Sequence, residues 1–268
     1  MSDRQYMAAA LRLAERGLYT TSPNPNVGCV IVSNGKVVGR GWHARAGEPH
    51  AEVHALREAG EQAHGADVYV TLEPCSHHGR TPPCADALVA AGVSRVLVAA
   101  QDPNPQVGGS GIETLEAAGI RVETGLLEAQ ALELNPGFVS RMQRGRPWVR
   151  LKLAASLDGR TAMASGESQW ITGDAARRDV QRLRARSSAI VTGIGTVLAD
   201  DPAMNVRLEA SDLNGVEPVR QPLRVVLDTQ LRTPATMKML SLPGETLVLT
   251  GNADVKARSV LQLSLIHI

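Results

Sequence analysis

The sequence predicts an α/β fold in two domains, and three observations support this prediction. Strand and helix patterns alternate through the first 125 residues, as in layered α/β folds with a partly parallel sheet. The alternation breaks at 135–147, a polar stretch with Pro and Gly at both ends, and then resumes. The length of 268 residues fits about two domains. We therefore place the boundary near Gly145 and expect domains at 1–145 and 146–262.

Each element of the first domain has its own signal. Apolar residues at positions 7, 10, 11 and 14 follow helical spacing. The apolar run 27–32 predicts a buried strand, and Asn34-Gly35 predicts a tight turn into a second strand at 36–39. Further along, the pattern predicts helices at 51–59, 85–91 and 113–118, and strands at 68–72, 95–100 and 120–123.

The second domain is expected to begin with an apolar strand at 148–153. A charged helix at 174–185 follows it. Three more apolar runs predict strands at 188–192, 223–227 and 246–249.

Composition excludes several functional classes. Hydrophobic residues make up 43% and charged residues 21%, which argues against a disordered chain. Lys and Arg number 28 against 27 Asp and Glu, so no general attraction to nucleic acid or anionic membrane is expected. The chain has no apolar run long enough to span a membrane and no secretory signal at its start. Three cysteines suit a reducing compartment, so we expect a cytoplasmic protein.

One histidine, two cysteines and one acidic residue form the strongest functional signal. A catalytic zinc takes three protein ligands and keeps one position open for water. His50, Cys75 and Cys84 supply one nitrogen and two thiolates. Glu52, two residues after His50 in the first turn of the predicted helix, is free to move protons beside the metal. The pattern predicts a Zn²⁺ site with Glu52 as the catalytic acid and base, and hydrolytic removal of an amino group from a ring carbon.

The spacing of the cysteines departs from the general signature. Zinc nucleobase deaminases carry H-x-E with P-C-x-x-C, whereas eight residues, 76–83, separate Cys75 from Cys84. This insert carries two histidines and Arg80, so we expect it to contact the substrate. A structural zinc site is the alternative, but such sites usually have four protein ligands. The third cysteine, Cys29, lies in an apolar run and is expected to be a buried strand residue.

Together these motifs resemble the bifunctional pyrimidine deaminase/reductase family of riboflavin biosynthesis. The segments that carry the resemblance in the first domain are 22–28, 50–52, 72–84 and 102–111. Those in the second domain are 152–160, 170–172 and 200–202. The resemblance implies a cytidine-deaminase-like α/β/α zinc domain followed by a dihydrofolate-reductase-like α/β domain. It covers nearly the whole chain.

The resemblance implies two successive reactions on a small phosphorylated pyrimidine. The first is zinc-dependent deamination of 2,5-diamino-6-ribosylamino-4(3H)-pyrimidinone 5′-phosphate, with release of ammonia. The second uses NADPH to reduce the ribosyl unit to a ribityl chain. No nucleic acid or membrane partner is implied, and the resemblance leaves formation of a homo-oligomer open.

The resemblance also implies binding residues for both reactions. In the deaminase domain they are Asn24, His43, His77 and Arg80. In the reductase domain, NADP would contact Ala154, Trp170, Thr196 and Asp200. The reductase substrate would contact Lys152, Ser168, Arg184 and Arg207. Two local alternatives stay open: Asn24 also suits turn chemistry beside Pro25, and Arg184 also suits a solvated helix face rich in arginine.

The end of the sequence departs from the family. No late glycine-rich cofactor segment precedes residue 268, so we expect the reductase domain at 146–262 to be incomplete and its activity impaired. The ending at 263–268 equals the translation of a common sequencing adaptor, and we expect it to be non-native. Two other functions stay open. One is a zinc deaminase of another nucleoside or a tRNA base, and the other is a zinc-stabilised module without activity.

Overall fold

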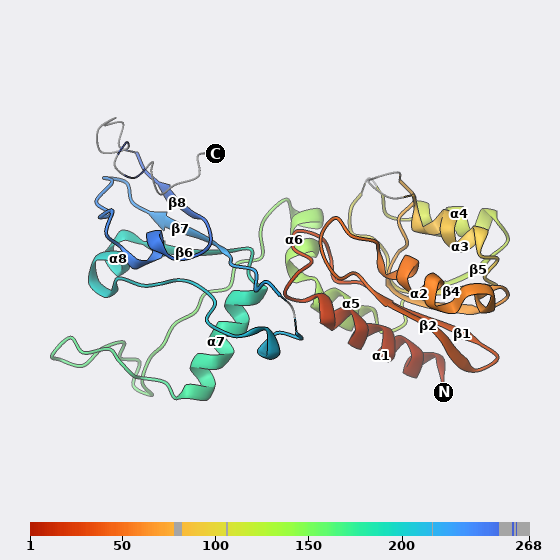
Figure 1. Ribbon diagram of the computed structural model, residues 1–268, viewed down its shortest axis with the longest axis horizontal. Helices are drawn as coiled ribbons and strands as arrows, with labels where there is room; N and C mark the ends of the chain where they lie inside the picture. The colour runs from red at the N-terminus through yellow and green to blue at the C-terminus, as the bar shows by residue number, and fades with distance from the viewer. Residues whose placement is uncertain (78–81, 106, 216, 252–258, 260, 262–268) are drawn as a thin grey trace. The chain divides into compact units, whose positions relative to one another are not determined.

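The computed structural model describes residues 1–77, 82–105, 107–215, 217–251, 259 and 261 (Figure 1). The chain divides into two compact units, Met1–Arg150 and Leu151–Ile268. Two sequence predictions, the substrate contact of Arg80 and the non-native ending at 263–268, lie outside the described residues.

The first unit is built on a five-stranded sheet with the strand order β2-β1-β3-β4-β5. Its strands are β1 (Gly28–Ser33), β2 (Lys36–Trp42), β3 (Asp67–Leu72), β4 (Arg95–Ala100) and β5 (Arg121–Thr124). β1 pairs antiparallel with β2 and β3, whereas β3, β4 and β5 run parallel. Every strand predicted in the first 125 residues is present, and Asn34-Gly35 forms the turn between β1 and β2.

Helices cover both faces of this sheet. They are α1 (Asp3–Ala14), α2 (Ala51–Ala59), α3 (Cys84–Ala90), α4 (Ser110–Ala117), α5 (Glu128–Leu134) and α6 (Pro136–Arg144), with short 3₁₀ turns η1 (Glu15–Gly17) and η2 (Gly60–Ala63). Buried side chains of α2, α3 and α4 form one core cluster, and those of α1 and α5 form a second. Figure 1 shows these two groups of helices beside the strands. The unit is therefore an α/β/α layered domain.

The alternation of side chains along β1 explains why both faces are covered. Cys29 and Ile31 point into one core cluster, while Val30 and Val32 point into the other. Successive residues of a strand face opposite sides of the sheet, so a strand that is apolar throughout must be buried on both. Cys29 is the buried strand residue that the sequence predicts.

Two glycines of β2 let helix α2 lie directly against the sheet. A Cβ at Gly41 would stand 2.0 Å from the carbonyl oxygen of Ala51, and one at Gly39 would stand 2.2 Å from that of Ala55. No side chain other than hydrogen fits between these backbones. The contact fixes the position of the first turn of α2, where Glu52 lies.

The second unit contains a parallel three-stranded sheet with the order β6-β7-β8. Its elements are α7 (Asp174–Arg186), β6 (Ala189–Gly193), α8 (Ile194–Asp200), η3 (Ala210–Asp212), β7 (Leu223–Leu227), α9 (Lys238–Ser241) and β8 (Thr246–Leu249). The buried residues of its core cluster are Val197, Met204, Val226 and Met239. The predicted helix and the last three predicted strands are present.

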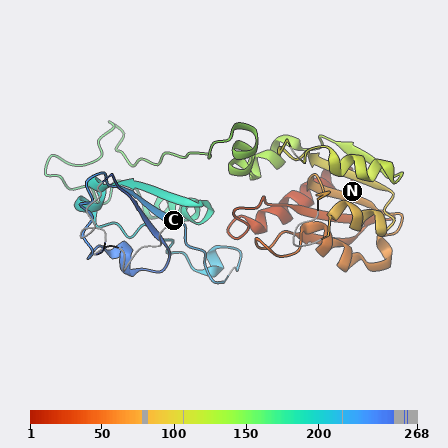
Figure 2. The ribbon, with the colours of Figure 1, turned by 90° about the horizontal axis from the view of Figure 1, so that it is seen from above.

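The strand predicted at 148–153 is wrong. These residues have no helix or strand structure, and the coil continues to 173 (Figure 2). The side chains of Val149, Leu151 and Leu153 are 78%, 81% and 72% exposed. A strand is held by hydrogen bonds to a neighbour, and no described strand pairs with this segment. The apolar pattern shows only that this segment could form a strand. It does not show whether a partner strand is present.

Helix α6 occupies the stretch that the sequence analysis treated as a break. Pro136 is its first residue, where the missing N–H costs no hydrogen bond, and Gly145 follows its last turn with a φ of 64°. These two residues, taken as signs of an irregular segment, instead mark the two ends of a short helix. Within the stretch 135–147, residues 136–144 are thus helical, and the irregular backbone begins at Gly145.

Candidate metal centre

The three predicted zinc ligands gather at two helix starts and one strand end. His50 immediately precedes α2, Cys75 follows β3, and Cys84 is the first residue of α3. The Nδ1 atom of His50 lies 3.5 Å from the Cys75 sulfur and 3.3 Å from the Cys84 sulfur. One donor atom from each residue lies within 4.8 Å of the others. The side chains can therefore reach a single ion.

Hydrogen bonds already tie these ligands together. The backbone N–H of Cys84 donates to the Cys75 sulfur over 3.3 Å. Contact between the two thiols lowers the pKa of Cys75 and raises the pKa of Cys84, and the hydrogen bond with Cys75 raises the pKa of His50. The pair therefore shares a negative charge beside the imidazole. A divalent cation is suited to replace the protons there.

Glu52 is a buried acid next to this group. Its side chain lies in the first turn of α2 and is 3% exposed, and within the described residues its Oε2 atom has no hydrogen-bond partner. Burial raises the pKa of Glu52 to about 7, and Cys75, His50 and Cys84 all affect it. A buried carboxyl oxygen without a hydrogen-bond partner destabilises the folded state, and such groups are often found at functional sites.

The residues present fit a catalytic zinc. One imidazole nitrogen and two sulfurs form a three-ligand set of the catalytic kind, which leaves a position open. A structural site would use a fourth protein ligand and would have no need of an unpartnered carboxyl oxygen beside it. Both the donor set and Glu52 therefore favour the catalytic alternative.

Asn24 and His43 lie on the His50 side of the centre. The Asn24 side-chain nitrogen is 3.1 Å from His43 Nε2, and His43 Nδ1 is 3.2 Å from the Pro49 carbonyl oxygen. The rings of His43 and His50 meet edge to face with centroids 5.3 Å apart. Burial lowers the pKa of His43, which favours its neutral form. His77 is exposed and interacts electrostatically with Asp102.

Glu73 is a feature of the site that the sequence analysis missed. It is 5% exposed at the end of β3, two residues before Cys75. Its Oε2 accepts the N–H groups of Asp102 and Gly109 over 3.1 and 3.0 Å. Its Oε1 accepts those of Gly111 and Ile112, in the first turn of α4, over 2.9 and 3.3 Å. The sequence signal that could have revealed Glu73 is a single acidic residue directly after an apolar strand.

We expect Glu73→Gln to lower the free energy of unfolding by about 2–4 kcal/mol. The new side-chain NH₂ would face two backbone N–H groups, and each buried donor left without an acceptor costs about 1–3 kcal/mol. Urea unfolding of the purified protein measures the loss. Glu113→Gln, at an exposed residue of α4, is the matched control and should change stability by less than about 1 kcal/mol. Equal stability of the two variants would show that the Glu73 contacts carry little energy.

In the second unit the structure brings two of the predicted arginines together. Arg184 on α7 is half-buried and donates to the carbonyl of Asn205 over 3.1 Å, and the backbone N–H of Arg207 donates to Gln181 over 3.0 Å. Burial, and then the charge of Arg207, lowers the pKa of Arg184. The structure therefore argues against the alternative in which Arg184 is simply part of a solvated, arginine-rich helix face.

The other predicted reductase residues are spread over exposed segments. Lys152 and Ser168 lie exposed in the coil 151–173, and Ala154 lies half-buried there. Thr196 and Asp200 are exposed on α8. Trp170 is 69% exposed, with the Arg177 guanidinium 4.4 Å from its ring centre. None of these positions is gathered into a closed site in the described residues.

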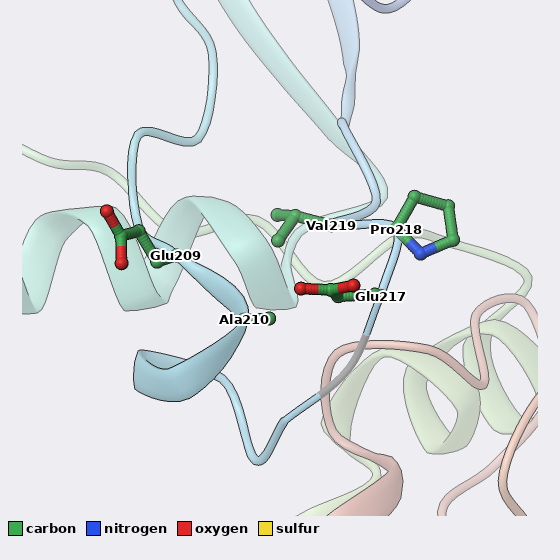
Figure 3. Close-up of a pocket in the computed structure, with 5 residues that line it drawn as sticks. All are labelled: Glu209, Ala210, Glu217, Pro218 and Val219. Carbon is green, nitrogen blue, oxygen red and sulfur yellow. The ribbon is translucent and has the colours of Figure 1, made fainter.

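A pocket of the second unit lies elsewhere. Its lining residues are Glu209, Ala210, Glu217, Pro218 and Val219 (Figure 3). None of them is a predicted site residue. The carboxylates of Glu209 and Glu217 would repel the phosphates of a nucleotide or a sugar phosphate. This pocket does not suit either predicted reductase ligand.

Two family descriptions match the chain, one for each half. Residues 1–100 match the cytidine and deoxycytidylate deaminase zinc-binding region, and residues 147–266 match the RibD C-terminal domain. Among the described residues, no helix combines the length and apolar character that crossing a membrane requires.

Relatives and solved structures agree with these matches. The riboflavin biosynthesis protein RibD of Escherichia coli K12 is 62% identical over 92% of this chain and 68% of its own length. That of Haemophilus influenzae is 57% identical over 88% of this chain and 65% of its own length. The structure of Acinetobacter baumannii RibD, 53% identical, superposes with a TM-score of 0.90 over 99% of this chain and 73% of that one. A Thermotoga maritima deaminase/reductase, 37% identical, gives 0.86 over 94% and 70%.

Fold, site and relatives define the class as a zinc-dependent deaminase fused to an NADPH-dependent reductase. The layered domain matches a zinc-binding deaminase region and gathers three residues that could hold a metal ion, and the second half matches a reductase domain. The chain belongs to the RibD family of riboflavin biosynthesis. It spans about two thirds of the length of the curated relatives given above.

Proposed function

We propose that His50, Cys75 and Cys84 hold Zn²⁺ and that Glu52 is the catalytic residue of a deaminase acting on 2,5-diamino-6-ribosylamino-4(3H)-pyrimidinone 5′-phosphate. The observation that carries the proposal is the buried Glu52 carboxyl, with an unpartnered oxygen, beside three gathered ligands. The reaction replaces the ring amino group with oxygen from water and releases ammonia.

Glu52 would act twice in each turnover. Zinc bound at this site would supply a Lewis acid that makes a water molecule easier to deprotonate. Glu52 Oε2, which has no hydrogen-bond partner within the described residues, would take up a proton from the attacking water. It would give that proton to the ring nitrogen. It would then take up the second proton, from the hydroxyl added to the ring carbon, and pass it to the amine, which leaves as ammonia. A pKa of about 7 suits both directions near neutral pH.

Asn24 and His43 would bind the edge of the pyrimidine. The Pro49 carbonyl can only accept, so Nδ1 of neutral His43 carries the proton and Nε2 accepts from the Asn24 amide. This contact orients the Asn24 side chain and leaves its oxygen for a donor of the substrate. His77 and Arg80, on the insert between the cysteines, would also line the pocket. His77 would hydrogen-bond the pyrimidine edge and Arg80 would contact the phosphate.

The second unit would carry the reductase reaction, with NADPH reducing the ribosyl unit to a ribityl chain. NADP would contact Ala154, Trp170, Thr196 and Asp200. The substrate would contact Lys152, Ser168, Arg184 and Arg207. The effect of the Arg207 charge on Arg184 supports the last two, because a phosphate bound by both side chains would offset the repulsion between them.

We also propose that the protein works in the cytoplasm without a nucleic-acid partner. Three free cysteines suit a reducing compartment, and the charge balance of +1 provides no general attraction to nucleic acid. A homo-oligomer is compatible with the proposal. All of the proposed deaminase residues come from a single chain.

Ammonia release from a panel of substrates tests the deaminase proposal. The phosphorylated diaminopyrimidine should release ammonia, while cytidine, adenosine and a tRNA should release none above background. Comparable release from cytidine or tRNA would instead favour a deaminase of another base. One bound zinc without ammonia from any substrate would favour a zinc-stabilised module without activity.

A further inference from the structure

We infer that Asn135 is a positioning residue for Asn24, and that it acts by holding the loop 21–26 in place. The inference rests on the proposed deaminase function and assigns a role to a residue that lies outside the zinc motifs. Asn135 is 109 positions from its partner Asn26 and stands between α5 and α6. It touches no predicted ligand of the metal and acts on the site only through the loop.

Asn135 and Asn26 join by several hydrogen bonds. Asn135 Oδ1 accepts the backbone N–H of Asn26 over 2.7 Å and its side-chain amide over 3.1 Å. In return, Asn135 Nδ2 donates to the Asn26 carbonyl over 2.9 Å. The Asn26 side chain also donates to the Leu134 carbonyl over 3.1 Å. Both backbone groups of Asn26 are thus satisfied by one distant amide.

The side chain of Asn135 is diverted from its usual task. The residue stands at the N-cap of α6, where asparagine normally accepts a hydrogen bond from the first turn of the helix. No such bond is present, and the side chain is buried against Asn26 instead. The Asn135 side chain, which could cap α6, therefore binds the loop at Asn26.

A continuous set of hydrogen bonds leads from Asn26 to His43. The Thr21 hydroxyl donates to Asn26 Oδ1 over 2.8 Å, and the Thr21 carbonyl accepts the Asn24 N–H over 2.7 Å. The Asn24 amide then meets His43 Nε2 over 3.1 Å. Thr21 is buried and Asn24 and Asn26 are half-buried, so water has limited access to these bonds. Loss of Asn135 would release the loop at the point where it presents Asn24.

Asn135→Ala should therefore weaken substrate binding and spare the metal. We expect KM for the phosphorylated diaminopyrimidine to rise about 10-fold or more, with kcat within about threefold, because loose ground-state contacts raise KM. Zinc content should stay at one per chain. Amide hydrogen exchange should quicken in 21–28, where Asn26 loses its acceptor, and stay unchanged in α2.

Two further variants make the test specific. Asn135→Asp keeps an acceptor for the Asn26 N–H and loses the donor to its carbonyl, so KM should fall between wild type and alanine. It also serves if the alanine variant fails to fold. Ser140→Ala removes a buried hydrogen bond of α6 to the Arg146 carbonyl and should leave KM unchanged.

The outcomes separate this inference from the proposed function. Unchanged KM and unchanged exchange in 21–28 for both Asn135 variants would overturn the inference, as would a joint loss of zinc, kcat and stability. If the wild-type protein releases no ammonia, the proposed function fails instead. Exchange in 21–28 then still shows whether Asn135 holds the loop, and unchanged exchange there overturns the inference.

Discussion

Glu52→Gln is expected to retain zinc and to lower the rate of ammonia release by about 10²–10⁴-fold, the contribution of general acid–base catalysis. The carboxamide has the shape of the carboxyl and removes its ability to take up and return a proton. The zinc ligands are untouched, so metal content should stay at one per chain. Steady-state ammonia release and zinc analysis of the same preparation measure both effects.

Glu58→Gln is the matched control for this variant. Glu58 lies on the same helix, α2, and is half-exposed in an ion pair with Arg40. Its replacement should leave kcat unchanged, because exposed ion pairs contribute little. Turnover of Glu52→Gln within tenfold of wild type would remove Glu52 from the catalytic step and leave the metal without a proton carrier in the described residues.

Gly41→Ala is expected to destabilise the first unit and to weaken zinc binding together. The new Cβ would lie 2.0 Å from the Ala51 carbonyl oxygen and 2.7 Å from the Ala55 nitrogen, both backbone atoms that no side-chain rotation can move. Helix α2 would have to shift away from β2, and His50 and Glu52 would shift with it. We expect a loss of about 3 kcal/mol or more in the free energy of unfolding, at the upper end for overpacking.

The zinc affinity of this variant should fall about 10–100-fold, the range for loss of support behind a metal ligand. Urea unfolding and competition with a chelator measure the two quantities. Gly137→Ala is the control, because a Cβ there meets no atom within 4 Å and the residue is helical. That variant should be neutral or stabilised by about 0.5–1 kcal/mol. Wild-type stability and affinity in Gly41→Ala would show that the close contact does not fix α2.

The gathering of His50, Cys75 and Cys84 could be predicted from the sequence because its signals are local. His50 and Glu52 share the start of one helix, and Cys75 and Cys84 flank one insert. The sheet could be predicted for a similar reason: the continuous apolar run of β1 implies burial on both faces wherever the strand lies.

The long-range hydrogen bonds that support the site could not be predicted from local sequence patterns. Glu73 accepts hydrogen bonds from backbone N–H groups 29 to 39 positions away, and a backbone group leaves no mark on residue type. Asn135 and Asn26 are 109 positions apart, and each alone suits a turn or a helix cap. The segment 148–153 shows the opposite error, because an apolar pattern cannot reveal whether a partner strand is present.

Stepwise addition of Zn²⁺ to metal-free protein, with ammonia release from the phosphorylated diaminopyrimidine followed at each step, tests the central claim most directly. Release should rise in proportion to added zinc and level off at one equivalent per chain. A parallel titration of His50→Ala should show no rise. Full activity in the metal-free protein, or a wild-type rise that persists in His50→Ala, would contradict a zinc deaminase built on His50, Cys75, Cys84 and Glu52.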